Sequence, residues 1–188
     1  TPFMEGGPGM STPWMAVLNV DGVDYPVLSQ REPAKLPWRQ MGVDVVFECT
    51  GVFTKREDLV KHIEAGARFV ILSAPAKSDD VPTVVHAVNR SQGTPAPIVS
   101  CASCTTNCIT PVVEVMGRRI GIKKATMTTI HAYTANQSIV DSGKKDYRRG
   151  RAGAANLVPA TTGAAIATTR ALPEYRGKFD GVAIRAPV

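Results

Sequence analysis

The segment 103–108, Ser-Cys-Thr-Thr-Asn-Cys, holds the residues with the clearest capacity for chemistry in this chain. It follows a short apolar run at 97–100 and precedes an apolar helical pattern at 109–116. A cysteine at such a junction lies at or near a helix N-terminus, where unpaired N–H groups and the helix dipole favour the thiolate over the thiol. With His131 further along the chain as a base, Cys104 is a candidate for covalent catalysis.

The four cysteines, Cys49, Cys101, Cys104 and Cys108, also allow other interpretations. Three of them lie within eight residues, in a chain without a visible export signal, which favours free thiols over a disulfide framework. The spacing Cys-x-x-Cys-x-x-x-Cys resembles a metal or redox motif, but no fourth cysteine lies nearby, and we expect no metal site. A further hypothesis is that Cys108 traps a sulfenic acid formed on Cys104.

Composition excludes some classes of protein. Hydrophobic residues make up 44% of the 188 residues, which is enough for a sizeable core, and no apolar run is long enough to span a bilayer. The beginning of the chain shows neither a basic region nor an apolar region of a signal peptide, so we expect a cytoplasmic protein without a membrane partner.

The net charge of +6 is local. Residues 1–116 carry nine Lys and Arg against twelve Asp and Glu, whereas residues 117–151 carry nine against two. A basic segment beside a reactive cysteine indicates a local anionic ligand. A nucleic-acid-binding module that uses 117–151 is the rival interpretation, but few aromatic residues accompany the basic ones, and we do not expect nucleic acid as a partner.

The elements that must position the cysteine follow from the apolar patterns. We expect a loop at 1–13, a hairpin of strands 14–20 and 23–28 across Asp21-Gly22, and a short helix or turn at 31–38. The run 43–49 predicts a strand covered on both faces of a parallel sheet. Thr54 and Glu57 form a capping-box pattern before a helix that starts at Lys55 and stops at Gly66. Strands are predicted at 69–73, 81–89 and 97–100, which together indicate βαβ organisation and an α/β fold.

The second half of the chain shows a different pattern. Residues 127–133 are rich in β-forming types, and the irregular segment 134–159 is long enough to suggest a functional loop or an interface. An alanine-rich helix is predicted from Thr161-Thr162-Gly163 to residue 172, and a strand at 179–184.

Several blocks of this sequence resemble one family. Ala102-Ser103-Cys104-Thr105-Thr106-Asn107-Cys108 resembles the phosphorylating glyceraldehyde-3-phosphate dehydrogenases. Five further blocks resemble them in order: Arg31-Glu32-Pro33-Ala34-Lys35-Leu36-Pro37-Trp38, Glu48-Cys49-Thr50-Gly51-Val52-Phe53, Leu72-Ser73-Ala74-Pro75-Ala76-Lys77, Thr129-Ile130-His131-Ala132-Tyr133-Thr134 and Pro159-Ala160-Thr161-Thr162-Gly163-Ala164-Ala165. The chain departs from the family in several ways: it has no Gly-x-Gly-containing first βα unit, it stops at residue 188 where the family continues, residues 1–13 match poorly, Glu32 stands where aspartate is more typical, and Cys101 stands where a small polar residue is typical.

The resemblance implies a fold class: a partial doubly wound, Rossmann-like nucleotide-binding domain at 1–103, followed by part of an α+β catalytic domain at 104–188. It also implies an internal fragment of a longer enzyme, and we expect little dehydrogenase activity from the chain alone. The implied reaction is the NAD- or NADP-dependent oxidation and phosphorylation of glyceraldehyde 3-phosphate to 1,3-bisphosphoglycerate. The alternatives are an erythrose-4-phosphate dehydrogenase and an inactive fragment. The implied partners are a phosphorylated aldehyde and inorganic phosphate, and the implied assembly is a homotetramer.

The resemblance also assigns roles to residues. Cys104 is the nucleophile that forms a hemithioacetal and then a thioester, and His131 is its base. Substrate phosphate and inorganic phosphate are bound by Ser103, Thr105, Thr134, Arg149, Thr162, Gly163 and Arg185, with Arg148 and Arg151 as neighbouring alternatives to Arg149. The cofactor is contacted by Arg31, Thr50, Gly51, Phe53 and Ser73. Ser142-Gly143 differs from the Leu-Pro of strictly NAD-dependent forms, which leaves NADP or dual use open.

Overall fold

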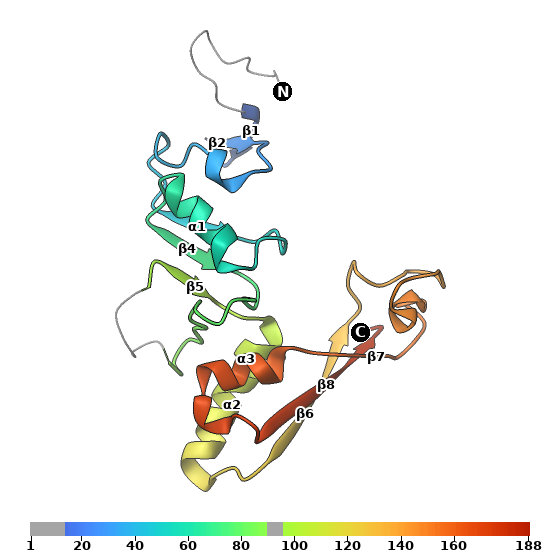
Figure 1. The fold of residues 1–188 in the computed structure, drawn as a ribbon. Helices are drawn as coiled ribbons and strands as arrows, with labels where there is room; N and C mark the ends of the chain where they lie inside the picture. Colours follow the sequence, from blue (N-terminus) through green and yellow to red (C-terminus); the bar gives the residue numbers. More distant parts are fainter. Residues whose placement is uncertain (1–13, 90–95) are drawn as a thin grey trace.

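The computed structural model describes residues 14–89 and 96–188 of the chain (Figure 1), and the loop expected at 1–13 lies outside them. The described strands form a two-stranded hairpin, a three-stranded parallel sheet and a three-stranded mixed sheet. Mixed α/β organisation, as the sequence predicts, is therefore confirmed. No helix in 14–89 or 96–188 is both long enough and apolar enough to cross a membrane.

The hairpin comes first in the chain. Strand β1 (Trp14–Val20) pairs antiparallel with β2 (Val23–Leu28). The turn between them has Asp21 at φ 50° and Gly22 at φ 81°, the left-handed conformations that a two-residue hairpin loop requires. The predicted hairpin and its Asp-Gly turn are confirmed, and a short 3₁₀ helix, η1 (Pro33–Lys35), follows as expected.

A βαβ unit forms the next layer. Strands β3 (Val45–Glu48), β4 (Phe69–Leu72) and β5 (Ile98–Ser100) are parallel in that order, and helix α1 (Arg56–Glu64) connects the first two. The helix packs on the sheet, and the shared core contains Leu59, Val70, Leu72, Ala76, Val81 and Ile98. Parallel strands place their carboxyl ends at one edge, which in open α/β sheets is the edge that binds ligands.

Two predictions in this region are wrong. Strand β3 is covered on only one face in the described part of the chain: Val46 and Glu48 are buried, but Val45 is 41% and Phe47 67% exposed. The continuous apolar run therefore does not reflect burial on both sides. The predicted strand at 81–89 consists of turns with a single bridge from Thr83 to Ser100. The Asn89 side chain bonds both the Val85 N–H and the Thr83 carbonyl, which closes this segment into a loop.

The predicted capping box of α1 is also wrong. The helix begins at Arg56 with Lys55 as N-cap, and the Lys55 side chain makes no capping hydrogen bond. The Thr54 hydroxyl is buried without a hydrogen-bond partner. Ser78 supplies the missing acceptor, because its hydroxyl oxygen accepts the Arg56 N–H at 2.9 Å. The stop is as predicted: Ala65 is the C-cap, and Gly66 follows at φ 117°.

The second half contains two helices and a mixed sheet. Helix α2 (Cys104–Ile120) packs against α3 (Ala164–Ala171), and buried Thr110 and Thr168 share a hydrogen bond of 3.0 Å between them. The sheet has the order β6-β8-β7, with bounds β6 (Ala125–Ala132), β7 (Val158–Ala160) and β8 (Phe179–Ala186). Strands β6 and β8 are parallel, and β7 is antiparallel to β8. Two short 3₁₀ helices complete the described elements, η2 (Tyr147–Gly150) and η3 (Pro173–Tyr175).

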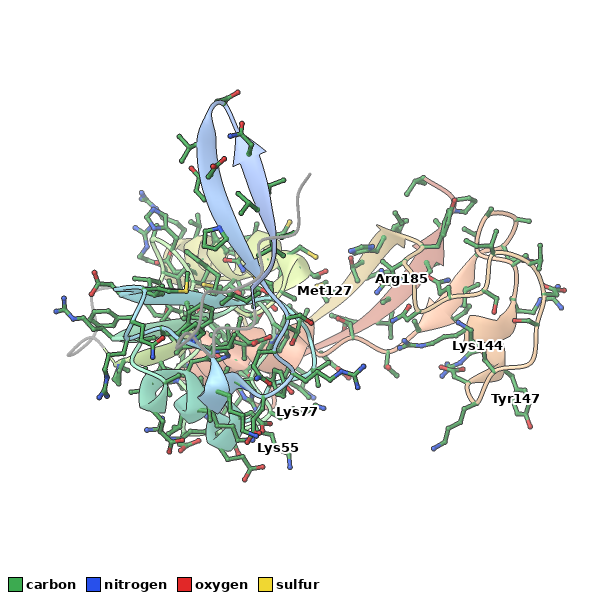
Figure 2. All side chains as sticks on the ribbon, turned by 90° about the horizontal axis from the view of Figure 1, so that it is seen from above. Lys55, Lys77, Met127, Lys144, Tyr147 and Arg185 are labelled. Carbon is green, nitrogen blue, oxygen red and sulfur yellow. The ribbon has the colours of Figure 1, made fainter. Side chains whose placement is uncertain are left out.

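The irregular segment predicted at 134–159 is confirmed, apart from η2 and the start of β7. Figure 2 shows its residues Lys144 and Tyr147 well away from the packed helices, beyond the strand end that carries Arg185. This segment exposes several apolar side chains, Ile139, Val140, Tyr147 and Leu157. A surface of this kind is typical of a contact with another protein.

Candidate active site

Cys104 is the first residue of α2, at the junction where the sequence places it. Ser103 caps the helix, because its hydroxyl oxygen accepts the Thr106 N–H at 3.1 Å. The Asn107 amide donates back to the carbonyls of Cys101 (2.6 Å) and Ser103 (2.9 Å), which fixes the turn that enters the helix. These contacts hold the exposed Cys104 thiol at the helix end, where the dipole stabilises negative charge.

His131 lies opposite this helix end on β6. Its Nε2 is 3.6 Å from the Cys104 sulfur, a distance at which the imidazole and the thiol share a hydrogen bond. The two residues line one pocket of about 420 Å³, together with Thr105, Cys108, Ile109 and the residues of β6 from Met127 to Ile130. A candidate nucleophile and a candidate base thus lie side by side in an open cleft, an arrangement that is suited to nucleophilic catalysis.

The electrostatics of the site favour the thiolate. The pKa of Cys104 is lowered from its ordinary value, first because His131 hydrogen-bonds the sulfur and then because the Thr105 hydroxyl and N–H do so too; partial burial acts in the opposite direction. At Cys101, burial raises the pKa of the thiol. Two cysteines that lie three residues apart therefore differ in reactivity for a local physical reason.

Arg185 is the second residue that meets His131. Strands β6 and β8 pair in parallel with His131 opposite Arg185, so both side chains leave the sheet on the same face. The Arg185 Nη1 atom lies 2.6 Å from His131 Nδ1 and 3.0 Å from the Ala132 carbonyl oxygen. A cation is thereby placed on the side of the imidazole that faces away from Cys104.

The other residues predicted to bind phosphate lie on three separate loops. Thr134 follows β6, and its hydroxyl donates to the Asn136 side chain at 2.9 Å. Arg149 belongs to η2 and pairs with Asp146 at 3.3 Å, and no contact within the described residues joins it to Cys104 or His131. Thr162 and Gly163 lead into α3, where the Thr162 hydroxyl oxygen accepts the Ala164 N–H at 3.1 Å.

The residues predicted to contact a cofactor lie mainly at the carboxyl ends of β3 and β4. Thr50 and Gly51 follow β3, and Ser73 follows β4 with its N–H bonded to the Glu48 carbonyl at 3.0 Å. Gly51 has φ 72°, and a Cβ added there would meet nothing within 4 Å, so the turn faces open space. Phe53 is half-buried beside this turn, and Arg31 is exposed before η1.

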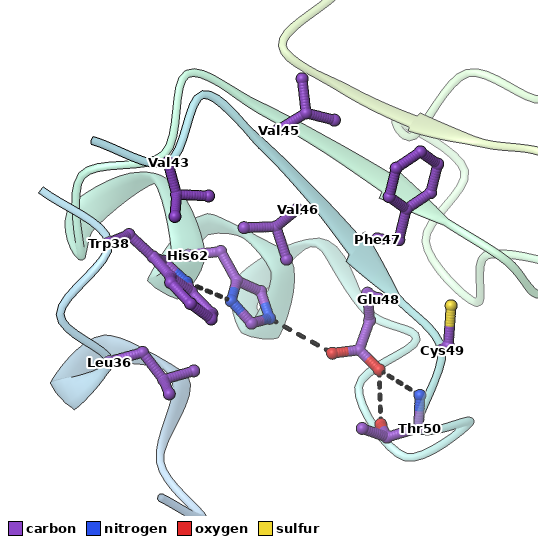
Figure 3. A pocket seen from close by; sticks show the side chains of 10 residues that line it. All are labelled: Leu36, Trp38, Val43, Val45, Val46, Phe47, Glu48, Cys49, Thr50 and His62. Atoms are coloured by element: carbon purple, nitrogen blue, oxygen red, sulfur yellow. Dashed lines mark hydrogen bonds and ion pairs between the residues drawn. The ribbon is translucent and has the colours of Figure 1, made fainter. Parts of the chain in front are cut away.

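A buried polar network shapes this edge and was missed by sequence reasoning (Figure 3). The Glu48 carboxylate is 3% exposed and accepts hydrogen bonds from both the N–H and the hydroxyl of Thr50. His62 Nε2 lies 3.2 Å from the other carboxylate oxygen, and the Trp38 indole N–H donates to His62 Nδ1 at 3.1 Å. The one signal in the sequence was a glutamate inside an apolar strand, which a parallel sheet buries only with partners.

The residues around this network also line a pocket of about 570 Å³, which includes the exposed side of β3 with Val45 and Phe47. All four cysteines are free thiols. In the described ranges, no group of three or more His, Cys, Asp or Glu side chains is arranged to hold a metal ion.

Comparison with known proteins matches two parts of the chain to one family. Residues 103–188 match the model described as glyceraldehyde 3-phosphate dehydrogenase, C-terminal domain, and residues 11–56 match glyceraldehyde 3-phosphate dehydrogenase, NAD binding domain. The chain belongs to the glyceraldehyde-3-phosphate dehydrogenase family. The resemblance carried by the sequence blocks is therefore confirmed, and the site described above lies in a segment that the family model covers.

Individual relatives agree. The chain is 51% identical over 173 residues to a glyceraldehyde-3-phosphate dehydrogenase of Streptomyces coelicolor, a match that covers 91% of this chain and 51% of the relative. It is 50% identical over 171 residues to the chloroplastic enzyme A of Zea mays (90% and 42% covered), and 49% identical over 172 residues to enzyme 1 of Bacillus subtilis (90% and 51% covered). The chain thus spans about half the length of the curated relatives it matches.

Proposed function

We propose that the protein oxidises glyceraldehyde 3-phosphate and phosphorylates the product to 1,3-bisphosphoglycerate, with NAD or NADP as cofactor. The observation that carries this proposal is the Cys104 sulfur held 3.6 Å from His131 Nε2 at the N-terminus of α2. The names of the relatives and the family models support it and favour neither of the alternatives, erythrose-4-phosphate dehydrogenase or an inert fragment.

The chemistry begins at the thiolate of Cys104. Its sulfur adds to the aldehyde carbon, the carbonyl oxygen takes a proton from the His131 side, and a hemithioacetal results. Loss of hydride from that carbon, with return of the hydroxyl proton to His131, leaves a thioester on Cys104. Attack by inorganic phosphate then releases the acyl phosphate and restores the thiolate. Helix N–H groups and His131 stabilise the negative oxygen that develops in each addition.

The residues at the carboxyl ends of β3 and β4 fit part of a dinucleotide. The open turn at Gly51, the exposed Ser73, the cation of Arg31 and the half-buried ring of Phe53 are suited to the polar and aromatic groups of such a molecule. The Thr50 hydroxyl is different, because it donates to Glu48 and accepts from the Val52 N–H. We therefore propose that Thr50 shapes the turn rather than bonding the cofactor through its hydroxyl. The nicotinamide ring, when bound, supplies the hydride acceptor.

The basic segment gives little support to a nucleic-acid-binding function. Several of its arginines are paired with acidic neighbours: Arg118 with Glu114 at 2.8 Å, Arg149 with Asp146 at 3.3 Å and Arg151 with Asp141 at 3.3 Å. Paired side chains contribute less to a field that attracts polyanions.

We also propose the division into domains at 1–103 and 104–188, a homotetramer and a cytoplasmic location. The assembly is supported by apolar side chains exposed outside the site, such as Val112, Val115 and Met116 on α2 and Ile139 and Val140 in the long segment. Native mass spectrometry and cell fractionation test the last two.

The first step of the proposed reaction can be tested without a cofactor. Glyceraldehyde 3-phosphate should protect Cys104 from iodoacetamide, read by mass spectrometry of the tryptic peptides, while Cys49 serves as an exposed control thiol. Glyceraldehyde, which lacks the phosphate, should protect at much higher concentration only. Cys108→Ser should retain this protection at Cys104. Equal protection of Cys49, or none at Cys104, would contradict the proposal.

A further inference from the structure

The Arg185 guanidinium is in direct contact with the proposed base. Its Nη1 atom is 2.6 Å from His131 Nδ1 and 3.0 Å from the Ala132 carbonyl oxygen, while Nδ1 itself is 2.8 Å from that oxygen. Three polar atoms thus form a small triangle on the far side of the imidazole from Cys104. Which atom donates to which determines what His131 can do.

A guanidinium can only donate hydrogen bonds. The Nη1 atom carries two hydrogens, and its two neighbours in the triangle, Nδ1 and the Ala132 oxygen, can each accept one. A hydrogen on Nδ1 would donate to the Ala132 oxygen at 2.8 Å, but it would leave two donor nitrogens, Nδ1 and Arg185 Nη1, 2.6 Å apart with no acceptor between them. With Arg185 in this position, Nδ1 therefore accepts, and a neutral His131 carries its hydrogen on Nε2.

This tautomer limits the chemistry of His131. Its Nε2 faces the Cys104 sulfur at 3.6 Å and, in the Nε2–H form, donates to a thiolate. It cannot accept the proton of the Cys104 thiol, because the nitrogen that faces the sulfur is already occupied. The arrangement stabilises a thiolate once formed but does not let His131 form it.

We propose that Arg185 is a positioning residue that holds His131 in the Nε2–H form, and that an anion bound by Arg185 releases it. After release, the imidazole loses its Nε2 proton to water and gains one on Nδ1, which donates to the Ala132 oxygen. The free Nε2 then takes the Cys104 thiol proton, leaving a thiolate and an imidazolium with no net uptake of protons. The anion-binding role of Arg185 rests on the proposed function; its hold on His131 does not.

An anion is the class of ligand that the Arg185 guanidinium is best suited to bind. Within 14–89 and 96–188, no Asp or Glu carboxylate lies within 4.0 Å of its guanidinium, and both of its acceptors at the triangle are uncharged. Charge-assisted bonds to a phosphate are stronger than bonds to a neutral nitrogen and a carbonyl, so a phosphate competes well for this side chain. The pocket of about 420 Å³ that contains Cys104 and His131 is lined by one further titratable residue, Cys108 of α2, and by no Asp, Glu, Lys or Arg.

The tautomer can be observed directly by NMR of the chain labelled with ¹⁵N in its histidine rings, with His131 assigned by its loss in His131→Asn. In buffer without phosphate, the unsubstituted chain should carry the hydrogen on Nε2, and inorganic phosphate should move it to Nδ1. Arg185→Met should show the Nδ1–H form without phosphate and no response to it. Arg185→Lys keeps a donor and should restore the Nε2–H form. Arg176→Gln removes a charge elsewhere and should behave as the unsubstituted chain.

The alkylation rate of Cys104 gives a second readout. Below the pH midpoint of its titration, phosphate should accelerate the reaction with iodoacetamide in the unsubstituted chain and in Arg176→Gln, and this acceleration should be absent in Arg185→Met. An Nδ1–H tautomer in the phosphate-free chain, or an Nε2–H tautomer in Arg185→Met, would overturn the claim that Arg185 holds His131 in the Nε2–H form. A tautomer that phosphate leaves unchanged overturns the release. Neither readout uses an aldehyde or a cofactor, so both remain distinct from the protection assay that tests the proposed function.

Discussion

Replacing His62 with phenylalanine tests whether the buried network at β3 holds the Thr50 turn in place. The side chain is 4% exposed, and the Trp38 N–H, which can only donate, makes Nδ1 an acceptor. His62 Nε2 therefore carries the hydrogen that bonds the Glu48 carboxylate across 3.2 Å. Phenylalanine keeps a ring of similar size but leaves a buried carboxylate oxygen and an indole N–H unpaired. The expected loss of unfolding free energy is about 3 kcal/mol, the cost of leaving a buried charged group without its partner.

Two further variants separate hydrogen bonding from packing. Trp38→Phe removes a single neutral donor and should cost only about 1 kcal/mol. The combination of His62→Phe with Glu48→Gln should cost less than the sum of the single losses, with a coupling of roughly 0.5–3 kcal/mol. His86 lies on the surface, so His86→Phe is a matched control that should stay within about 0.5 kcal/mol. Urea unfolding measures all of these as midpoint shifts at constant slope. A His62→Phe loss no larger than that of His86→Phe would refute the argument.

Three other outcomes are expected. Iodoacetamide should alkylate Cys104 at lower pH than Cys101, because the His131 hydrogen bond lowers the pKa of Cys104 while burial raises the pKa of Cys101. His131→Phe should move the pH midpoint of Cys104 alkylation to higher pH. Mass spectrometry that shows this midpoint unmoved would contradict the expectation. Ser103→Ala should lower the free energy of unfolding by about 1 kcal/mol through loss of the α2 cap. Thr54→Val should be neutral or stabilising, because the buried Thr54 hydroxyl has no hydrogen-bond partner. Equal losses of stability in thermal melts would reject the distinction. Gly66→Ala should lower the free energy of unfolding more than Gly22→Ala does. Both positions have positive φ, but only at Gly66 would the new Cβ lie 2.5 Å from Arg39 Cβ. Urea midpoints that coincide for the two variants would count against this expectation.

The elements that could be predicted from the sequence are those set by local patterns. The Asp21-Gly22 turn determines the hairpin, and the apolar spacing around Leu59 determines α1. The predictions failed where a distant side chain decided the outcome. Ser78, not Thr54, bonds the first turn of α1, and the Asn89 amide turns the β-forming run 81–89 into a loop. Neither contact has a signature in the residues that it organises.

The same division applies to the candidate site. Cys104 at the start of a helix follows from local sequence, and the resemblance carried by the block 129–134 assigns His131 as its base. The contact of Arg185 with His131 joins residues 54 apart in sequence, and no local pattern indicates it. The hydrogen-bonded network of Trp38, His62 and Glu48 could not be predicted for the same reason, because no local pattern around any of the three residues indicates its partners.

The His131–Arg185 contact depends on the register of two strands rather than on either residue alone. Strands β6 and β8 pair residue by residue from Ala125 with Phe179 to Ala132 with Ala186. Because side chains alternate between the faces of a sheet, a slip of one residue would move Arg185 to the opposite face and leave His131 Nδ1 free to donate to Ala132. The Cys104–His131 distance, in contrast, depends on where α2 begins, and Ser103 and Asn107 determine that point. The nucleophile and the control of its base are therefore set by separate structural features, so substitutions that loosen the strand register should change the tautomer of His131 before they move the thiol.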